Sequence, residues 1–205
     1  MIFSSSDKAY GSLMGNAYLE NHQLKGNYPY DVSKSASDLI VQSYVKTYNL
    51  KAGIIRSGNI YGPGDLNMDR LVPHVIISSL LKKRSILRSN GKLIRDYIYV
   101  EDVANAYFIL MKKMINSKER LKIYNVGSKE NLTVKNFVKL ITKMVNGKEI
   151  SPIIKNNSKI EIYKQKLDYR KIKKDLNWSP KSNFKVSLNT TIEWYKKNLN
   201  FFNGK

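Results

Sequence analysis

The sequence contains no cysteine, and His22 and His74 are its only histidines. Without thiols the chain can form no disulfide bond and offers no ligands for a cysteine-based zinc site. Two histidines far apart along the chain are too few for a metal site built on imidazole. We therefore expect no bound metal ion.

Long apolar runs are lacking as well. The longest, Leu71 to Leu81, is interrupted by His74 and falls well short of the roughly 20 residues needed to span a bilayer. The amino terminus, Met1-Ile2-Phe3-Ser4, has neither the basic start nor the long apolar segment of a secretory signal. These features predict no membrane span and a cytoplasmic location.

Acidic residues are scarce relative to basic ones. The chain has 16 Asp and Glu against 36 Lys and Arg, which gives a formal net charge of +20. Basic side chains attract nucleic acid or acidic lipid when they gather on one face. Here lysines occur in nearly every segment after Lys34, which indicates solvated surface charge. We expect no nucleic-acid partner; the alternative, a polyanion binder, would lose nucleic-acid affinity steeply with added salt.

The sequence also lacks a glycine-rich phosphate-binding turn. Nucleotide-binding α/β enzymes join a strand to a helix through such a turn, so that backbone amides at the helix start hold a pyrophosphate. No G-x-G-x-x-G, nor a relaxed version of it, occurs in the 205 residues. The chain instead opens on a strand pattern that ends in a polar cluster.

Short apolar runs alternate with segments of helical periodicity, which is typical of an α/β fold. Strands are expected over Ile2 to Ser5, Ala52 to Arg56, Ile94 to Val100, Lys122 to Val126 and Ile160 to Lys164.

The clearest helix is expected from Tyr30 to Tyr48, because Pro29 favours a helix start. Its apolar or small residues fall at helical spacing, at Ala36, Leu39, Ile40, Ser43 and Tyr44. Asp102 and Thr133 are expected to cap two later helices.

The polar cluster Ser5-Ser6-Asp7-Lys8 ends the first predicted strand, and Tyr30 and Lys34 follow on the first predicted helix. Residues at i and i+4 share a helix face, so the Lys34 ammonium can stabilise a Tyr30 phenolate that acts as general base for a hydroxyl. Ser6 could hydrogen-bond the same hydroxyl. The spacing alone is weak evidence, because the Tyr169 and Lys173 pair repeats it in a highly charged helix with no serine-bearing strand before it.

The order of serine strand, Tyr-x-x-x-Lys helix and following strand resembles the short-chain dehydrogenase/reductase superfamily. The stretches Arg56 to Asp65, Arg95 to Ala104 and Tyr124 to Gly127 are similar to its extended branch, the NAD-dependent epimerase/dehydratase family. The resemblance covers nearly the whole chain. It implies the carboxyl-terminal half of a Rossmann-type doubly wound parallel sheet, plus a small mixed α/β substrate-binding domain, with the glycine-rich half missing.

In that arrangement residues 1–65 would be the remaining part of the dinucleotide-binding domain, with the catalytic Ser, Tyr and Lys. Residues 66–205 would mainly form the substrate-binding domain, with segments near 94–127 returning to the first domain. The resemblance also implies NAD as cofactor, contacted by Ser5, Tyr30 and Lys34. It further implies a nucleotide-sugar substrate and a homodimer.

The run Ser6-Asp7-Lys8 resembles that of CDP-glucose 4,6-dehydratases. The resemblance implies that Asp7 protonates the departing C6 hydroxyl and that Lys8 removes the C5 proton, where many related enzymes use Glu. Lys8 must be neutral for that role. A turn with a surface ion pair is the structural alternative for Asp7 and Lys8.

The resemblance also implies that Asn59 and Arg95 contact the substrate diphosphate, with Arg70 a further phosphate or ribose contact. A capping role for Asn59 and a solvated helix start for Arg70 are the structural alternatives. The expected function is therefore an NAD-dependent sugar-nucleotide 4,6-dehydratase. A 4-epimerase like UDP-glucose 4-epimerase, or a non-catalytic remnant without the NAD-binding half, are the alternatives.

Overall fold

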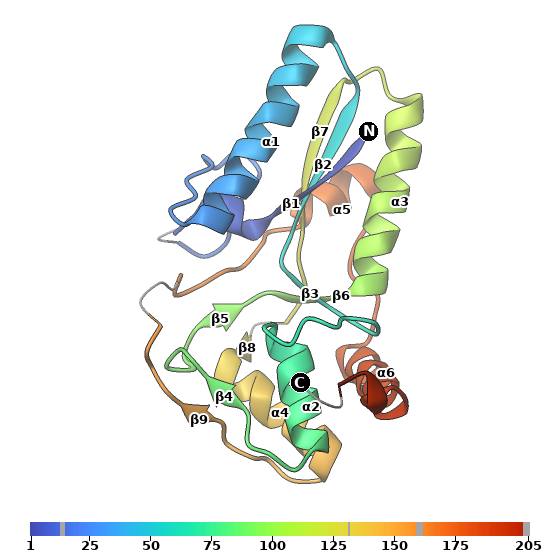
Figure 1. The fold of residues 1–205 in the computed structure, drawn as a ribbon. Coiled ribbons are helices and arrows are strands. Elements are labelled where there is room, and N and C mark those ends of the chain that lie inside the picture. The colour runs from blue at the N-terminus through green and yellow to red at the C-terminus, as the bar shows by residue number, and fades with distance from the viewer. Residues whose placement is uncertain (13–14, 131, 159–161, 203–205) are drawn as a thin grey trace. The chain divides into compact units, whose positions relative to one another are not determined.

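The computed structural model describes residues 1–12, 15–130, 132–158 and 162–202 (Figure 1), and the chain divides into two compact units. Unit 1 comprises Met1–Ile60, Arg95–Asn131 and Ile162–Lys181. Unit 2 comprises Tyr61–Ile94, Leu132–Glu161 and Ser182–Lys205.

Unit 1 is built on a parallel sheet of strands β1 (Ile2–Ser6), β2 (Ala52–Ser57) and β7 (Leu121–Val126), in the order β1-β2-β7. Every residue of the central strand β2 is buried, as expected for a parallel strand covered on both faces. The predicted α/β class with a parallel sheet is confirmed.

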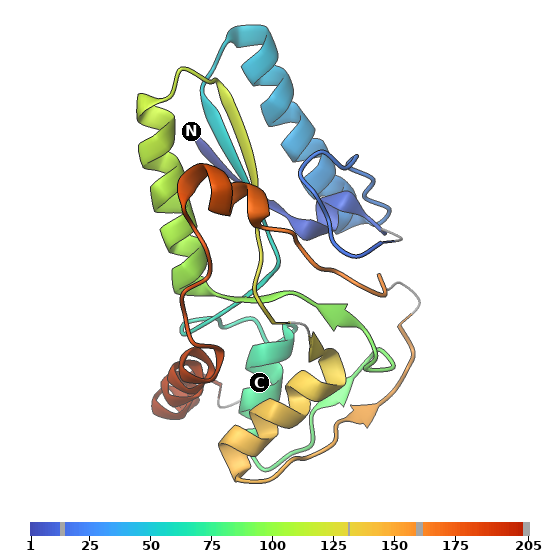
Figure 2. The same ribbon diagram turned by 180° about the vertical axis from the view of Figure 1, so that it is seen from behind.

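Helices cover both faces of this sheet (Figures 1 and 2). Successive side chains of a strand point to opposite faces, so Ile54 packs with Val41 and Val45 of α1 (Pro29–Tyr48). Ile55 on the other face packs with Leu110 of α3 (Val100–Asn116) and with residues of α5 (Arg170–Leu176). The short 3-10 helix η1 (Asp7–Tyr10) follows β1 directly.

The apolar stripe that predicts α1 is not its buried face. Leu39, Ile40 and Tyr44 are about half exposed, at 51%, 56% and 53%, while Asp38 of the same helix is fully buried. Burial of that carboxylate is possible because Arg56 of β2 pairs with it. The buried face of α1 therefore combines an ion pair with the apolar side chains of Val41 and Val45.

The strand predicted over Ile94 to Val100 is shorter and interrupted. It forms β5 (Ile94–Arg95) and β6 (Tyr97–Tyr99), and α3 begins at Val100 with Tyr99 as its N-cap. The prediction that Asp102 caps this helix is wrong. Asp102 lies in the first turn, and its carboxylate accepts a hydrogen bond from the Lys181 amide at 2.9 Å.

The other predicted strand with a different outcome is Ile160 to Lys164. Residues 159–161 lie outside the described part of the chain, and residues 162–164 belong to no named strand. The short strand β3 (Asn59–Tyr61) follows β2 closely.

Unit 2 contains the helices α2 (Leu71–Leu80), α4 (Val134–Asn146) and α6 (Phe184–Lys197) and the 3-10 helix η2 (Leu199–Phe202). Its short strands are β4 (Ile86–Leu87), β8 (Leu132–Thr133) and β9 (Ile153–Ile154). Thr133 caps α4 as predicted, by accepting a hydrogen bond from the Asn136 amide. None of the helices in the described ranges is long and apolar enough to cross a membrane.

Candidate active site

Three of the predicted site residues meet at the carboxyl end of β1. The Ser6 side chain caps η1 by accepting a hydrogen bond from the Lys8 amide at 3.3 Å. The Ser6 hydroxyl in turn donates to Oδ1 of Asp7 at 3.1 Å. The carboxyl ends of parallel strands are where α/β proteins bind ligands. The turn therefore presents Ser6, Asp7 and Lys8 together at that edge.

Asp7 is a buried acid. Only 2% of its surface is exposed, and its Oδ2 atom has no hydrogen-bond partner among the described residues. Burial raises the pKa of Asp7 to about 6, and the carboxylate of Asp96 adds to this rise, while the charges of Lys8 and Arg95 oppose it. A carboxyl group with such a pKa is partly protonated near neutral pH and can donate a proton.

The charge of Lys8 affects the pKa values of two carboxyl groups. It is half-buried, and its charge lowers the pKa of Asp7 and of Asp31 against the effect of burial. Asp31, in the first turn of α1, is only 4% exposed, and burial raises its pKa. Sequence reasoning missed Asp31, because no pattern in the helix marks that position as buried.

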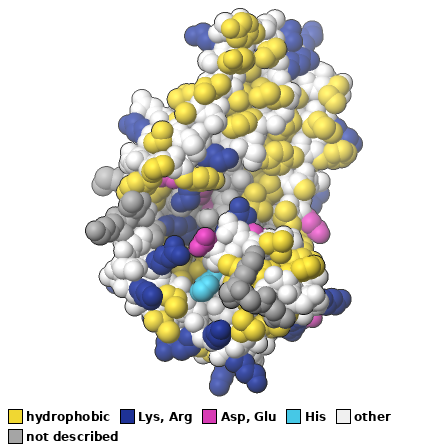
Figure 3. Space-filling model, in the orientation of Figure 1, with side chains coloured by type: hydrophobic (Ala, Val, Ile, Leu, Met, Phe, Trp, Pro, Cys, Tyr) yellow, Lys and Arg dark blue, Asp and Glu magenta, His cyan; other side chains and the backbone are white. Residues whose placement is uncertain are grey.

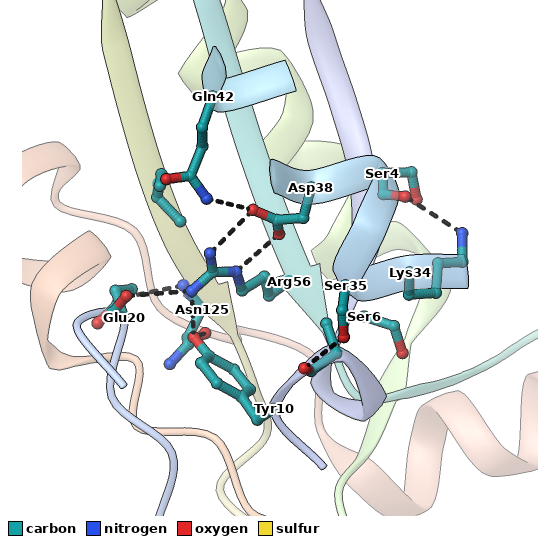
Figure 4. Close-up of polar contacts among 12 residues, drawn as sticks. Ser4, Ser6, Tyr10, Glu20, Lys34, Ser35, Asp38, Gln42, Arg56 and Asn125 are labelled. Carbon is teal, nitrogen blue, oxygen red and sulfur yellow. Dashed lines mark hydrogen bonds and ion pairs between the residues drawn. The ribbon is translucent and has the colours of Figure 1, made fainter. Parts of the chain in front are cut away.

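Tyr30 and Lys34 occupy the first two turns of α1. The Lys34 Nζ atom lies 5.8 Å from the centroid of the Tyr30 ring, and it donates a hydrogen bond to the Ser4 carbonyl of β1 at 3.3 Å (Figure 4). Tyr30 is 54% exposed, whereas Ser5 is buried. The Tyr-x-x-x-Lys pair thus stands beside β1, the strand that leads into Ser6.

Asp96 joins three segments of unit 1. Its carboxylate accepts hydrogen bonds from the amides of Ser128 at 2.7 Å and Leu167 at 3.0 Å. Its carbonyl accepts from the Asn59 amide at 2.7 Å. The Lys166 ammonium lies 3.8 Å from the same carboxylate. Asp96 therefore fixes the loop that contains Arg95.

The three residues expected to contact substrate are divided between the two units. Arg95 is buried and donates to the Ile162 carbonyl at 2.6 Å, and the Asn59 Nδ2 atom is buried with no partner among the described residues. Both lie in unit 1. Arg70 belongs to unit 2, where its exposed side chain pairs with Asp65 at 3.1 Å at the start of α2.

A buried ion pair between Asp38 and Arg56 is the most prominent polar feature that sequence reasoning missed. The Arg56 Nε donates to the Asp38 Oδ2 atom at 2.8 Å, with both side chains almost fully buried. An acidic residue on a helix and a basic one on a strand give no signal that they meet. Within the described ranges, no three histidine or acidic side chains cluster as metal ligands.

The sequence model of the NAD dependent epimerase/dehydratase family matches residues 1–127. Among curated proteins, dTDP-glucose 4,6-dehydratase of Haemophilus influenzae is 30% identical over 206 residues, covering 93% of this chain and 59% of that protein. The trifunctional UDP-glucose 4,6-dehydratase/UDP-4-keto-6-deoxy-D-glucose 3,5-epimerase/UDP-4-keto-L-rhamnose-reductase of Arabidopsis thaliana is 30% identical over 201 residues, covering 96% of this chain and 29% of that protein.

Solved structures give the same result. UDP-glucose 4-epimerase of Thermotoga maritima, solved with UDP-glucose, matches with a TM-score of 0.85 and 28% identity over 97% of this chain and 63% of that one. dTDP-glucose 4,6-dehydratase of Bacillus anthracis, solved with NAD, matches with a TM-score of 0.85 and 28% identity over 97% of this chain and 62% of that one. The chain therefore spans less than two thirds of the length of these proteins.

The fold and the order of the site residues agree with the family whose model matches the chain. The expected cofactor, NAD, is confirmed by the family description and by the Bacillus anthracis complex. This chain belongs to the NAD-dependent epimerase/dehydratase family, with its Rossmann-type α/β fold.

Proposed function

We propose that this chain carries the catalytic residues of a sugar-nucleotide 4,6-dehydratase. The observation that supports it most is Asp7, a buried carboxyl group whose pKa is raised to about 6, at the end of the serine-bearing strand. A 4-epimerase needs no acid at that position, because it eliminates no water. The name of the Haemophilus influenzae relative, a dTDP-glucose 4,6-dehydratase, agrees with this choice.

The residues have the following roles in this proposal. Tyr30, with Lys34 beside it, removes the proton of the sugar C4 hydroxyl, which Ser6 holds by a hydrogen bond. NAD, held by Ser5, Tyr30 and Lys34, would supply the hydride acceptor for oxidation at C4 and the hydride donor for C6. With C4 oxidised, Lys8 as the neutral amine takes the proton of C5, the C6–O bond breaks, and Asp7 protonates the leaving hydroxyl so that water departs.

The chain's own residues fit the nicotinamide side of the cofactor. Tyr30 and Lys34 share one face of α1 beside β1, and Ser5 lies at the end of the same strand. The glycine-rich turn that would hold the pyrophosphate does not occur in the sequence. We place the dinucleotide-binding domain in residues 1–65 with segments near 94–127, and the substrate-binding domain mainly in residues 66–205.

For the substrate, Asn59 and Arg95 are proposed to bind the diphosphate, since one has an unpartnered amide among the described residues and the other a guanidinium. Arg70 would add a phosphate or ribose contact. The Ser6-Asp7-Lys8 run favours CDP-glucose, whereas the similar curated proteins carry dTDP- and UDP-glucose in their names. Parallel turnover assays with CDP-, dTDP- and UDP-glucose would identify the nucleotide that the protein accepts.

We also propose that a second copy of this chain packs on the outer face of α1. Val32, Ala36, Ile40, Tyr44 and Tyr48 are exposed and recur every four residues, so they form one ridge along the helix. Figure 3 shows apolar side chains along the surface that α1 occupies in Figure 1. The same ridge on two copies is self-complementary, as a two-fold dimer requires.

The variant Asp7→Asn tests the assignment of the acid. It keeps the size of the side chain but cannot donate a carboxyl proton, so we expect oxidation at C4 to continue while loss of water falls at least ~100-fold. Mass spectrometry of the products from each nucleotide glucose with NAD measures both steps. Asp69→Asn, at an exposed ion pair of unit 2, is the matched control. Full dehydration by Asp7→Asn would overturn the assignment.

A further inference from the structure

A buried polar network centred on Arg56 connects α1 to β2 (Figure 4). Arg56 binds Asp38 through two parallel hydrogen bonds, from Nε at 2.8 Å and from Nη2 at 2.9 Å. Gln42, one turn further along α1, donates to the same carboxylate at 2.7 Å. Asp38 and Arg56 are 0% and 1% exposed, so bulk water does not reach this ion pair.

The network continues from Arg56 to Tyr10, the last residue of η1. The Arg56 Nη1 atom donates to the Tyr10 hydroxyl at 2.9 Å, and that hydroxyl donates to Oδ1 of Asn125 on β7 at 2.7 Å. Burial raises the pKa of Tyr10 to about 12, so the hydroxyl keeps its proton and the direction of these two bonds is fixed. Tyr10 thus connects η1 to both β2 and β7.

Tyr10 and Asp38, two members of this network, lie close along the chain to proposed catalytic residues. Tyr10 is three residues after Asp7 in η1, and residues at i and i+3 of a 3-10 helix lie above one another. Asp38 is four residues after Lys34 in α1, which is one helical turn. Three consecutive partners, Asp38, Arg56 and Tyr10, therefore join the turn that carries Asp7 to the helix that carries Lys34.

We propose that Tyr10 is a positioning residue for Asp7: its hydroxyl, held between Arg56 and Asn125, fixes η1 so that the Asp7 carboxyl group stays buried at the end of β1. This inference deepens the proposed function, since Asp7 is a catalytic residue only under that function. The ring of Tyr10 has a separate packing role, because it stacks on Tyr18 at 4.8 Å between centroids.

Removal of the hydroxyl separates positioning from packing. Tyr10→Phe keeps the ring and its stack but takes one partner from Arg56 and one from Asn125. The turn should then loosen and admit water to Asp7. The charged groups that act on Asp7, namely Lys8, Asp96 and Arg95, remain in the chain, so a change at Asp7 would report its burial.

The test is a pH titration of the ligand-free chain followed by 13C NMR of the aspartate carboxyl groups, with the Asp7 signal assigned by its loss in Asp7→Asn. We expect the pKa of Asp7 to fall from about 6 toward its ordinary value, by about one unit or more, in Tyr10→Phe. Tyr61→Phe is the matched control, because Tyr61 is a buried tyrosine of unit 2 whose hydroxyl bonds to Ser187 at 2.7 Å. It should leave Asp7 unchanged.

An Asp7 pKa that is the same in Tyr10→Phe as in the parent chain contradicts the proposal. If Tyr10→Phe does not fold, Asn125→Leu removes the acceptor of the same hydroxyl while keeping the number of side-chain heavy atoms, and the same downward shift is expected; its absence is equally contradictory. The readout needs no turnover. Failure of the dehydratase assignment would therefore leave this result standing, and an unchanged Asp7 pKa would leave the dehydratase assignment untouched.

Discussion

Asp7 and Asp38 are both buried, yet their environments act in opposite directions. Burial raises the pKa of Asp7, whereas hydrogen bonds and the charge of Arg56 outweigh burial and lower the pKa of Asp38. The first carboxyl group is suited to hold and donate a proton, and the second to remain an anion that anchors a helix.

The Asp38 anchor leads to a stability prediction. Asp38→Asn leaves the Arg56 guanidinium buried without a counter-charge, which costs roughly 3–5 kcal/mol of unfolding free energy. Urea denaturation followed by circular dichroism measures the loss. Asp69→Asn is the control, because Asp69 and Arg88 form an exposed pair at 3.4 Å and such pairs contribute under about 1 kcal/mol. Equal effects of the two variants would show that the buried pair does not hold α1 in place.

Which site residues the sequence could identify follows from how each is recognised. Ser6, Tyr30 and Lys34 stand in a fixed order along strand and helix, so they could be proposed from the sequence. The burial of Asp31 and the contacts of Tyr10 could not, because each depends on segments that meet only after folding.

Among the elements, α1 shows most clearly what periodicity can and cannot predict. Spacing of apolar residues correctly predicts a helix over this segment, with bounds that differ by one residue. It does not tell which face is buried, because Val41 and Val45 share the inner face with Asp38. The capping prediction at Asp102 failed because α3 already begins at Val100, after the loop that Asp96 fixes.

The outer face of α1 carries the prediction at this scale. Ile40→Glu puts a charge in the middle of the apolar ridge, so we expect a dimer of the parent chain to become monomeric. Sedimentation velocity over a range of concentrations measures this. Ile115→Glu, at an equally apolar and exposed position on α3, should leave the dimer intact. A parent chain that is monomeric at every concentration, or an Ile40→Glu dimer, would rule out this face.

At the scale of the whole molecule, the motifs proposed for catalysis and substrate binding lie in a chain that spans 59% of its Haemophilus influenzae relative. Unit 1 holds Ser6, Asp7, Lys8, Tyr30 and Lys34, and with them Asn59 and Arg95. No G-x-G-x-x-G turn occurs in the sequence given.

The most direct test of the central claim is the product formed from nucleotide glucose and NAD in deuterated water. A dehydratase removes the C5 proton, so the account predicts a 4-keto-6-deoxy sugar nucleotide that has lost one water and carries deuterium at C5. Mass spectrometry and proton NMR read both features in one sample. A product of unchanged mass with inverted C4 and no deuterium at C5 would contradict dehydration and establish epimerisation instead.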